Sequence, residues 1–247
     1  MIGCRVVCGL AAVVLAASPV AAQTWTERVH VSVNAGVLSG TQDFTDRFEF
    51  EENLETGSTS VDYQVQGGFT FDAGLGYRIW KGLGAGASVS FFSSDNAAAT
   101  TSRVPHPFFF NQPREVVGDA TDIGRSETGV HIQAMYLLNP AGPLRVVLSG
   151  GPSFFSITQD VVTSVKVVET FPYDTAEFGS ADRQEESGSA MGFNVGADVF
   201  WMLSRQFGVG GLFRFSKASI DLDAPDGRQL PVDAGGVFAG GGIRLVF

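Results

Sequence analysis

Cysteine is almost absent from this sequence of 247 residues. The only two, Cys4 and Cys8, lie among the first 22 residues. If that segment is removed during secretion, the remaining chain can form no disulfide, has no thiol nucleophile and offers no cysteine ligand to a metal. We therefore expect no metal held by cysteine sulfur. No cofactor and no other metal site are expected either.

The first 22 residues have the three parts of a secretory signal peptide. Arg5 lies near the start, an apolar run follows over 6–17, and small residues at 20–22 precede Gln23. The run is shorter than the roughly 20 residues that a membrane-spanning helix needs, which disfavours an uncleaved anchor. We predict a signal peptide over 1–22 and a single domain over 23–247.

Basic residues are also scarce. Without Arg5, 15 of the 16 lysines and arginines remain against 26 acidic residues, so the mature chain carries a formal charge of −11. Nucleic-acid binding relies on basic patches that neutralise phosphates. No nucleic-acid partner is expected.

Motifs of enzymes are missing as well. There is no Gly-x-Ser-x-Gly, no Walker loop and no His-Glu-x-x-His. The string at 82–87 has the outline of a dinucleotide-binding loop, but two-residue alternation continues through it where that motif needs a helix. The three histidines, His30, His106 and His131, lack the spacing of a ligand set or a catalytic triad. We expect no enzyme, and we interpret His30 and His131 as polar fillers.

Long apolar runs are absent after Gln23, yet apolar and other residues alternate with period two in eight segments, which predicts strands with two different faces. In the first, Val29, Val31 and Val33 alternate with His30 and Ser32. The predicted strands cover 29–37, 69–79, 83–91, 130–138, about 144–157, 191–201, 207–215 and 237–247. An even number of antiparallel strands can close into a barrel in which every backbone group is paired.

The connections between these strands alternate between short and long. Short turns are expected around Lys81, over 139–143 and around Arg205, whereas long polar loops are expected over 39–64, 93–127, 158–187 and 222–231. Transmembrane barrels sort their connections in this way, with short turns on the periplasmic side and long loops outside. The fold class predicted is therefore all-β, an eight-stranded antiparallel up-and-down transmembrane barrel.

The two faces of the strands have different chemistry. The face with Gly, Ser, Arg and Asp is assigned to the lumen and the apolar face to lipid. Six aromatic residues lie near strand ends, where interfacial girdles are expected, although packing on neighbouring strands explains any single one equally well. They are Tyr77, Trp80, Tyr136, Trp201, Phe207 and Phe247.

The chain resembles the outer-membrane β-barrel domain family, which includes small OmpA-like and OmpX-like barrels. The last strand, with Ile243, Leu245 and a final Phe247, is similar to the terminal signal of such proteins, and segments 149–155 and 192–198 look like their repeated strand motifs. The resemblance implies location in the outer membrane, contact with its lipid and lipopolysaccharide, and insertion by the barrel-assembly machinery through the last strand. It implies no particular activity. We expect a monomer.

Charged residues of the lumen face form the only candidate site. Their binding role is left open, and they are Asp72, Arg78, Asp198, Arg214 and Arg244. In a barrel of eight strands such charges hold strands in register and plug the interior; a selectivity constriction in a small pore is the alternative. We favour the plug.

The predicted long loops suggest contacts outside the barrel. Acidic residues gather in 43–52 and 174–186, where solvation is a simpler explanation than calcium binding because no defined calcium loop is present. Three consecutive phenylalanines, Phe108 to Phe110, are framed by Pro105 and Pro113. They suggest either a partner surface or, as the ordinary explanation, packing on the barrel mouth.

Three functions remain open. The working hypothesis is a structural or surface-interaction barrel that acts through its extracellular loops. A narrow pore for small solutes is the first alternative, and a membrane-embedded lipid-modifying enzyme, which would need a serine, a histidine and an acid near the outer rim, is the second. Fold analogy does not choose among them.

Overall fold

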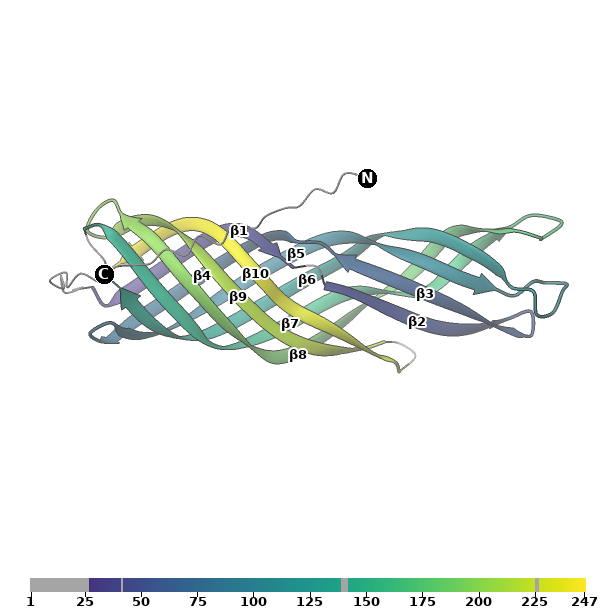
Figure 1. The fold of residues 1–247 in the computed structure, drawn as a ribbon, viewed down its shortest axis with the longest axis horizontal. Coiled ribbons are helices and arrows are strands. Elements are labelled where there is room, and N and C mark those ends of the chain that lie inside the picture. The colour runs from purple at the N-terminus through teal and green to yellow at the C-terminus, as the bar shows by residue number, and fades with distance from the viewer. Residues whose placement is uncertain (1–26, 41, 139–141, 225–226) are drawn as a thin grey trace, which may run out of the picture.

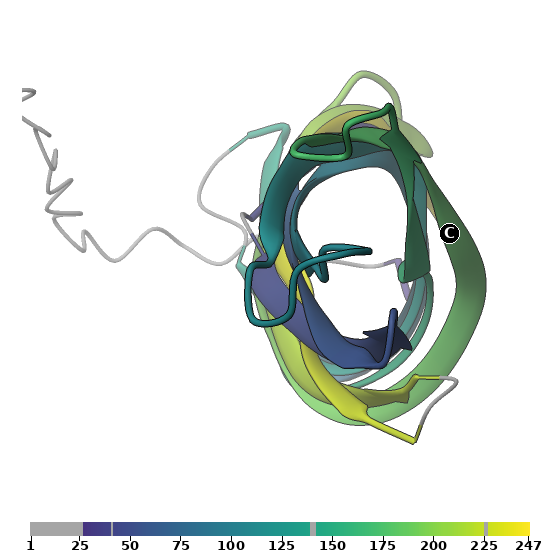
Figure 2. The same cartoon turned by 90° about the vertical axis from the view of Figure 1, so that its right-hand side faces the viewer.

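A computed structural model of the chain describes residues 27–40, 42–138, 142–224 and 227–247. The predicted signal peptide therefore lies outside the described residues, as do parts of two turns. The described chain is a long β-barrel with hairpins that project far beyond one end (Figure 1). Viewed from that end, the strands form a ring (Figure 2).

All ten strands belong to one antiparallel sheet. They are β1 (Val29–Ser39), β2 (Gln42–Glu52), β3 (Glu55–Val65), β4 (Gly68–Trp80), β5 (Leu83–Val104), β6 (Arg114–Leu138), β7 (Leu144–Glu169), β8 (Ala176–Met202), β9 (Phe207–Asp223) and β10 (Gln229–Val246). Eight of them close the ring in the order β1-β4-β5-β6-β7-β8-β9-β10, with β10 paired to β1. The prediction of a closed eight-stranded antiparallel barrel is confirmed.

The faces of the strands are arranged as predicted near the short turns. In β4, Phe71, Leu75 and Ile79 point outward and are more than half exposed, whereas Asp72 is buried in the lumen. The outward apolar positions of β4 run from 69 to 79, about 33 Å of strand, which at a tilt of about 40° spans about 25 Å, the height of a lipid-facing band. We call this part of the barrel the membrane segment.

Three of the four long connections are not loops, contrary to the prediction. The segment 39–64 contains the hairpin β2–β3, and 93–127 and 158–187 consist largely of the outer halves of β5 to β8, whereas 222–231 contains the connection between the ends of β9 and β10. β6, β7 and β8 have 25, 26 and 27 residues, whereas a strand needs only about 9–11 to cross a membrane. The barrel therefore continues as a β-sheet extension well beyond the membrane segment.

Polarity is reversed in this extension, which explains why its strands were predicted as loops. In β9 the inward residues Ala218, Ile220 and Leu222 are apolar and buried, whereas Ser219 and Asp221 between them face outward and are exposed. The buried apolar residues form two clusters, one among β7, β9 and β10 and one among β2, β3, β5, β6 and β7. The extension thus has the apolar core and polar surface of a soluble protein.

The turns at the other end are short, as expected. Lys81, with a φ of 49°, and Gly82 join β4 to β5, and the Ser204 hydroxyl accepts hydrogen bonds from the backbone N–H groups of Gln206 and Phe207 between β8 and β9. The turn predicted over 139–143 lies partly outside the described residues. Within the described ranges no helix is long and apolar enough to span a membrane.

Candidate functional site

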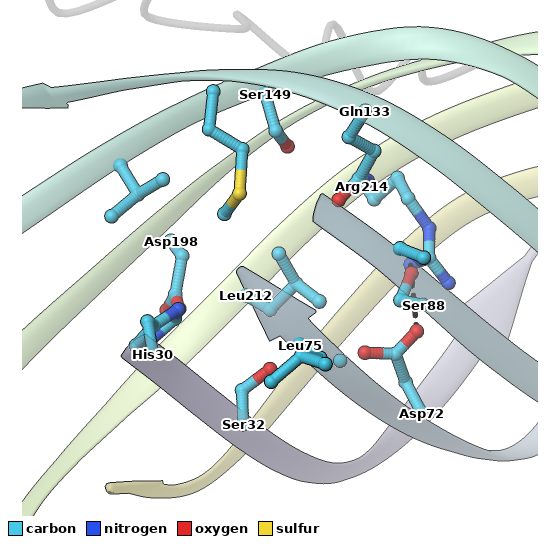
Figure 3. Close-up of a pocket in the computed structure, with 14 residues that line it drawn as sticks. His30, Ser32, Asp72, Leu75, Ser88, Gln133, Ser149, Asp198, Leu212 and Arg214 are labelled. Carbon is cyan, nitrogen blue, oxygen red and sulfur yellow. Dashed lines mark hydrogen bonds and ion pairs between the residues drawn. The ribbon is translucent and has the colours of Figure 1, made fainter. Parts of the chain in front are cut away.

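Asp72 and Arg214, both candidates from the sequence, form an ion pair inside the barrel. Arg214 Nη1 lies 2.6 Å from Asp72 Oδ2 and also donates to Ser88 Oγ at 3.0 Å. The second carboxylate oxygen of Asp72 accepts a bond from Asn34 Nδ2 at 3.2 Å. Since β1 and β10 separate β4 from β9, the pair crosses the lumen (Figure 3).

Asp198 and Arg244 form a second pair, with two hydrogen bonds. Arg244 Nε and Nη2 donate to the two carboxylate oxygens at 2.8 and 2.6 Å. His30 approaches the same carboxylate, with Nε2 at 3.7 Å from Oδ2, and stacks on Phe200 at 5.2 Å between ring centroids. The pair itself, His30 and Phe200 are all buried. The two opposite charges neutralise each other within the lumen.

Arg78, the fifth candidate, belongs to neither pair. It lies near the end of β4 and lines, with Glu27, Arg28 and Tyr77, a cavity of only about 10 Å³. Its backbone N–H donates to the carbonyl of Arg28 at 2.8 Å. The structure therefore brings together four of the five predicted residues, in two separate pairs, and places Arg78 at the short-turn end.

A third charged group spans the lumen at the outer end of the membrane segment. Arg125 on β6 donates through Nε and Nη2 to Glu127 Oε1 at 2.9 and 2.7 Å, and its Nη2 also reaches the carbonyl of Asp233 on β10. Glu127 Oε2 accepts the N–H of Gly235 at 3.0 Å. We call Arg125 and Glu127, with their contacts on β10, the crossbar, because β6 and β10 lie opposite in the ring.

Sequence reasoning missed the crossbar because Arg125 and Glu127 were assigned to a polar loop. One signal could have revealed it: both residues continue the lumen-facing alternation of Gly129, His131 and Gln133 toward the N-terminus of β6. The contact of Gly235 has no such signal in the sequence. Its φ of 86° directs the N–H to Glu127, and the sequence shows only that a glycine is present at this position.

His131 also lies in the lumen, and its partners among the described residues are two serine hydroxyls. Its ring nitrogens bond Ser90 Oγ at 3.0 Å and Ser153 Oγ at 2.8 Å, and Ser153 Oγ accepts a bond from Asn194 Nδ2 at 2.8 Å. His131 and Ser153 are fully buried. This arrangement fixes the imidazole in a polar network that joins β5, β6, β7 and β8.

Little space remains between these side chains. The cavity that His30, Asp72, Ser88, Asp198 and Arg214 line has a volume of about 30 Å³ (Figure 3). Another, next to the crossbar, measures about 10 Å³. A water molecule needs roughly 10–15 Å³ measured in this way, so the first cavity has room for about two waters and the second for one at most.

A larger cavity lies outside the membrane segment, at the far tip of the extension. It has a volume of about 470 Å³ and lies between the β5–β6 and β7–β8 connections. We call it the distal pocket, and its lining residues are His106, Phe109, Gln112, Pro113, Arg114, Glu115, Asp174, Thr175 and Ala176. It is absent from the sequence-based candidates because its two walls are 60 residues apart in the chain.

Arg114 and His106 hold the walls of the distal pocket in place. Arg114 donates to the carbonyls of Pro105 at 2.8 Å and Tyr173 at 3.1 Å, and it forms an ion pair with Glu169. His106 Nδ1 accepts the backbone N–H groups of Phe108 and Phe109 at 3.1 and 3.2 Å. The two connections are thereby fixed to each other by buried side chains.

The three consecutive phenylalanines lie at this tip, not on the mouth of the membrane segment. Phe108, Phe109 and Phe110 are 66, 54 and 65 % exposed, and Phe171 on the neighbouring connection is 80 % exposed. Phe108 also contacts Tyr173, with ring centroids 5.6 Å apart. We call these four phenylalanines the aromatic tip.

Most acidic residues of the two segments lie on strands and not in loops, with Asp174 in the β7–β8 connection as an exception. Asp43, Glu49 and Glu51 face outward on β2 and are exposed, whereas Asp46 is buried and pairs with Arg228. In the described part of the chain no three histidine or acidic side chains are grouped closely enough to hold a metal ion.

The chain was compared with known proteins. The family model for the outer membrane protein β-barrel domain matches residues 8–242, and no curated protein sequence matches. Among solved structures, the outer membrane protease OmpT from Escherichia coli aligns over 89 % of this chain and 97 % of its own, with 8 % identity and a TM-score of 0.51. At this identity the likeness concerns the fold alone.

Two further structures align over similar lengths. Neisserial surface protein A covers 89 % of this chain and 97 % of its own, with 12 % identity and a TM-score of 0.48. OprG from Pseudomonas aeruginosa covers 90 and 97 %, with 9 % identity and a TM-score of 0.40. Because the family model covers nearly the whole chain, this protein belongs to the outer membrane protein β-barrel domain family and is located in the outer membrane.

Proposed function

We propose that this protein is a closed barrel that conducts no solutes and presents a rigid β-sheet extension outside the cell, whose tip contacts another macromolecule. The observation that carries the proposal is the contrast between the two ends of the barrel. The Asp72–Arg214 pair and the crossbar cross the lumen, the Asp198–Arg244 pair joins β8 to β10 along its wall, and two cavities between these groups measure about 30 and 10 Å³. The extension has its own apolar core and ends in exposed aromatic residues.

The length of the extension supports a role outside the membrane. Strands of 25 to 27 residues are more than twice as long as crossing requires. Large exposed apolar side chains at the end of such a structure are a typical mark of a contact surface. Phe108, Phe110 and Phe171 fit that description.

The alternatives have less support. A pore would need a continuous path, but Asp72 and Arg214 are bonded to each other across the lumen, and the crossbar joins β6 to β10. A lipid-modifying enzyme would need an accessible nucleophile, but His131 and its partner Ser153 are fully buried and no carboxylate orients the ring through a hydrogen bond. We therefore infer a binding role and no catalysis.

Conductance across a planar bilayer tests the closed lumen. The full-length mature protein should give no channel steps, and neither should Arg125→Ala combined with Glu127→Ala, because the Asp72–Arg214 pair still crosses the lumen. Steps from the wild-type protein at neutral pH would overturn the proposal in favour of a pore.

Attachment of whole cells tests the contact role. Cells that display the wild-type protein are compared with cells whose 106–112 segment is replaced by a short Asn-Gly turn, on surfaces coated with protein or with polysaccharide. Heat-modifiability on a gel confirms that both barrels are folded. Loss of attachment in the variant supports the role, and equal attachment contradicts it.

A further inference from the structure

We propose that the distal pocket binds a basic side chain, the ammonium or guanidinium group of an extended peptide segment. This inference deepens the contact role proposed above and rests on it. The volume of about 470 Å³ lies within the range of about 300–1,000 Å³ that is usual for ligand pockets. It suffices for one or two residues of a peptide.

The charge balance of the pocket favours a cation. Glu115 and Asp174 both line it, and Asp174 has a side chain that is 72 % exposed. The one guanidinium in the wall, that of Arg114, is already paired with Glu169 and bonded to two carbonyls. An anion would therefore meet two carboxylates whose charges Arg114 does not balance.

The remaining walls suit the stem of a lysine or an arginine. Phe109, Pro113 and Ala176 offer apolar surface, and the exposed ring of Phe109 can contact a cation through its face. Gln112 adds an amide oxygen as an acceptor. A long apolar stem with a cationic head matches this combination better than a neutral sugar does, because a sugar has no charge for the carboxylates.

His106 indicates that the pocket is organised before a ligand arrives. Its Nδ1 accepts two backbone N–H groups, so the ring proton is on Nε2, which is buried without a hydrogen-bond partner and lies 3.9 Å from Asp174 Oδ1. The imidazole thus directs its N–H toward the carboxylate at the rim. A pocket fixed in this way does not have to be ordered on binding, which lowers the entropic cost.

The test is peptide binding to the full-length mature protein in detergent micelles. The probe is the tetrapeptide acetyl-Leu-Lys-Leu-Lys-amide, labelled for fluorescence anisotropy. The two pocket carboxylates are neutralised in Glu115→Gln with Asp174→Asn. The control is Glu49→Gln with Glu185→Gln, which removes two exposed carboxylates from β2 and β8 outside the pocket.

We expect the pocket variant to bind the probe about tenfold more weakly, since each exposed ion pair contributes a factor of a few, and the control variant to bind as the wild type does. Raising the salt concentration from 0.05 to 0.5 M should weaken wild-type binding. The same peptide with both lysines acetylated should bind as weakly to the wild type as the probe does to the pocket variant.

Three results would overturn the inference: equal binding of the acetylated peptide, equal loss in both variants, or preferential binding of maltotriose, which would indicate a sugar site. Each of these results can be told apart from a failure of the proposed contact role. If the peptide result is negative while removal of 106–112 still abolishes cell attachment, the tip contacts its partner through the aromatic residues and not through the pocket.

Discussion

Glu127 on β6 accepts a hydrogen bond from the backbone N–H of Gly235 on β10, at 3.0 Å, although three strands separate β6 from β10 in either direction around the ring. The contact therefore spans the lumen. It marks the level at which the polar interior of the membrane segment ends and the apolar core of the extension begins, since Ala234 and Val232 follow on the inner face of β10.

Gly235 should be intolerant of a side chain. Its φ is 86°, and a Cβ would lie 2.5 Å from the carbonyl oxygen of Ser216. We expect Gly235→Ala to lower the melting temperature measured by heat-modifiability, or to prevent folding. Gly227→Ala is the matched control, because Gly227 also has a positive φ, of 82°, but open space around it. In this control an added Cβ costs only the strain of the positive φ, about 1–2 kcal/mol. Equal losses in both variants would show that the contact with Ser216 is unimportant.

Removing one charge of the Asp72–Arg214 ion pair should lower the free energy of unfolding more than removing both charges. Arg214→Met leaves a buried carboxylate without its cation, which costs about 3–5 kcal/mol. The double variant with Asp72→Asn removes both charges, and we expect it to recover most of that loss. Urea unfolding of the protein in lipid vesicles measures the two free energies. A double variant as unstable as Arg214→Met would argue that packing, and not charge, dominates at this position.

Tyr63 supplies the hydroxyl that accepts the backbone N–H of Val162, at 2.7 Å, between β3 and β7. Tyr63→Phe leaves that buried N–H without its acceptor, and we expect a loss of about 1–3 kcal/mol in the free energy of unfolding. Tyr173→Phe, at the half-buried tip, should have little effect.

The same tyrosine should make the extension sensitive to alkali. Burial raises the pKa of Tyr63 above its ordinary value of 10, so the folded state favours the neutral phenol. The resulting stability is complete below pH 10 and is lost as the pH rises toward the raised pKa. Melting temperatures above pH 10 should therefore fall more steeply for the wild type than for Tyr63→Phe. Parallel curves would contradict the assignment.

The membrane segment was predictable from the sequence, and the extension was not. In the membrane segment, lipid requires every outward residue to be apolar, so strands such as 29–37 and 69–79 give an unbroken alternation, and β1 and β4 lie there. Outside the membrane, the outer halves of β5 to β10 are not subject to this requirement. Thr100 and Ser102 face inward on β5 beside Ala98, and a pattern of small and polar residues does not distinguish such a strand from a loop.

The candidate site was predicted in part for a similar reason. Two-residue alternation assigned four charged residues to the lumen face, where a charge among small residues is conspicuous. They are Asp72, Asp198, Arg214 and Arg244. Which charge pairs with which depends on the shear of the barrel, and period-two alternation carries no information about it. The distal pocket depends further on the approach of two hairpin tips, to which no local pattern points.

The carboxylate of Asp233 should stabilise the folded protein at neutral pH and lose this effect in acid. The Ser219 hydroxyl donates to its carboxylate at 2.7 Å and Lys217 lies 3.0 Å away, and both hold the pKa of Asp233 below its ordinary value. This contribution is present above pH 4 and is lost as the pH falls through the lowered pKa. Asp233→Asn should therefore be less stable than the wild type at pH 7, by less than about 1 kcal/mol for so exposed a group. The two proteins should converge near pH 2. A difference that persists at pH 2 would have to come from packing.

Arg228 fastens the β2–β3 hairpin to the rest of the extension. It pairs with the buried Asp46, donates to the carbonyl of Arg47 at 2.9 Å and lies over the ring of Phe48, 5.1 Å from its centroid. Among the described strands β2 is hydrogen-bonded to β3 alone, so loss of these contacts should loosen its other edge. We expect Arg228→Met to speed amide hydrogen exchange over 42–52 at least tenfold while the membrane segment stays protected. Arg205→Met, in the short turn between β8 and β9, is the control for loss of one arginine. Unchanged exchange in β2 would mean that the apolar contacts of Phe44 and Phe48 alone hold the hairpin, and that the ion pair with Asp46 only neutralises a buried charge.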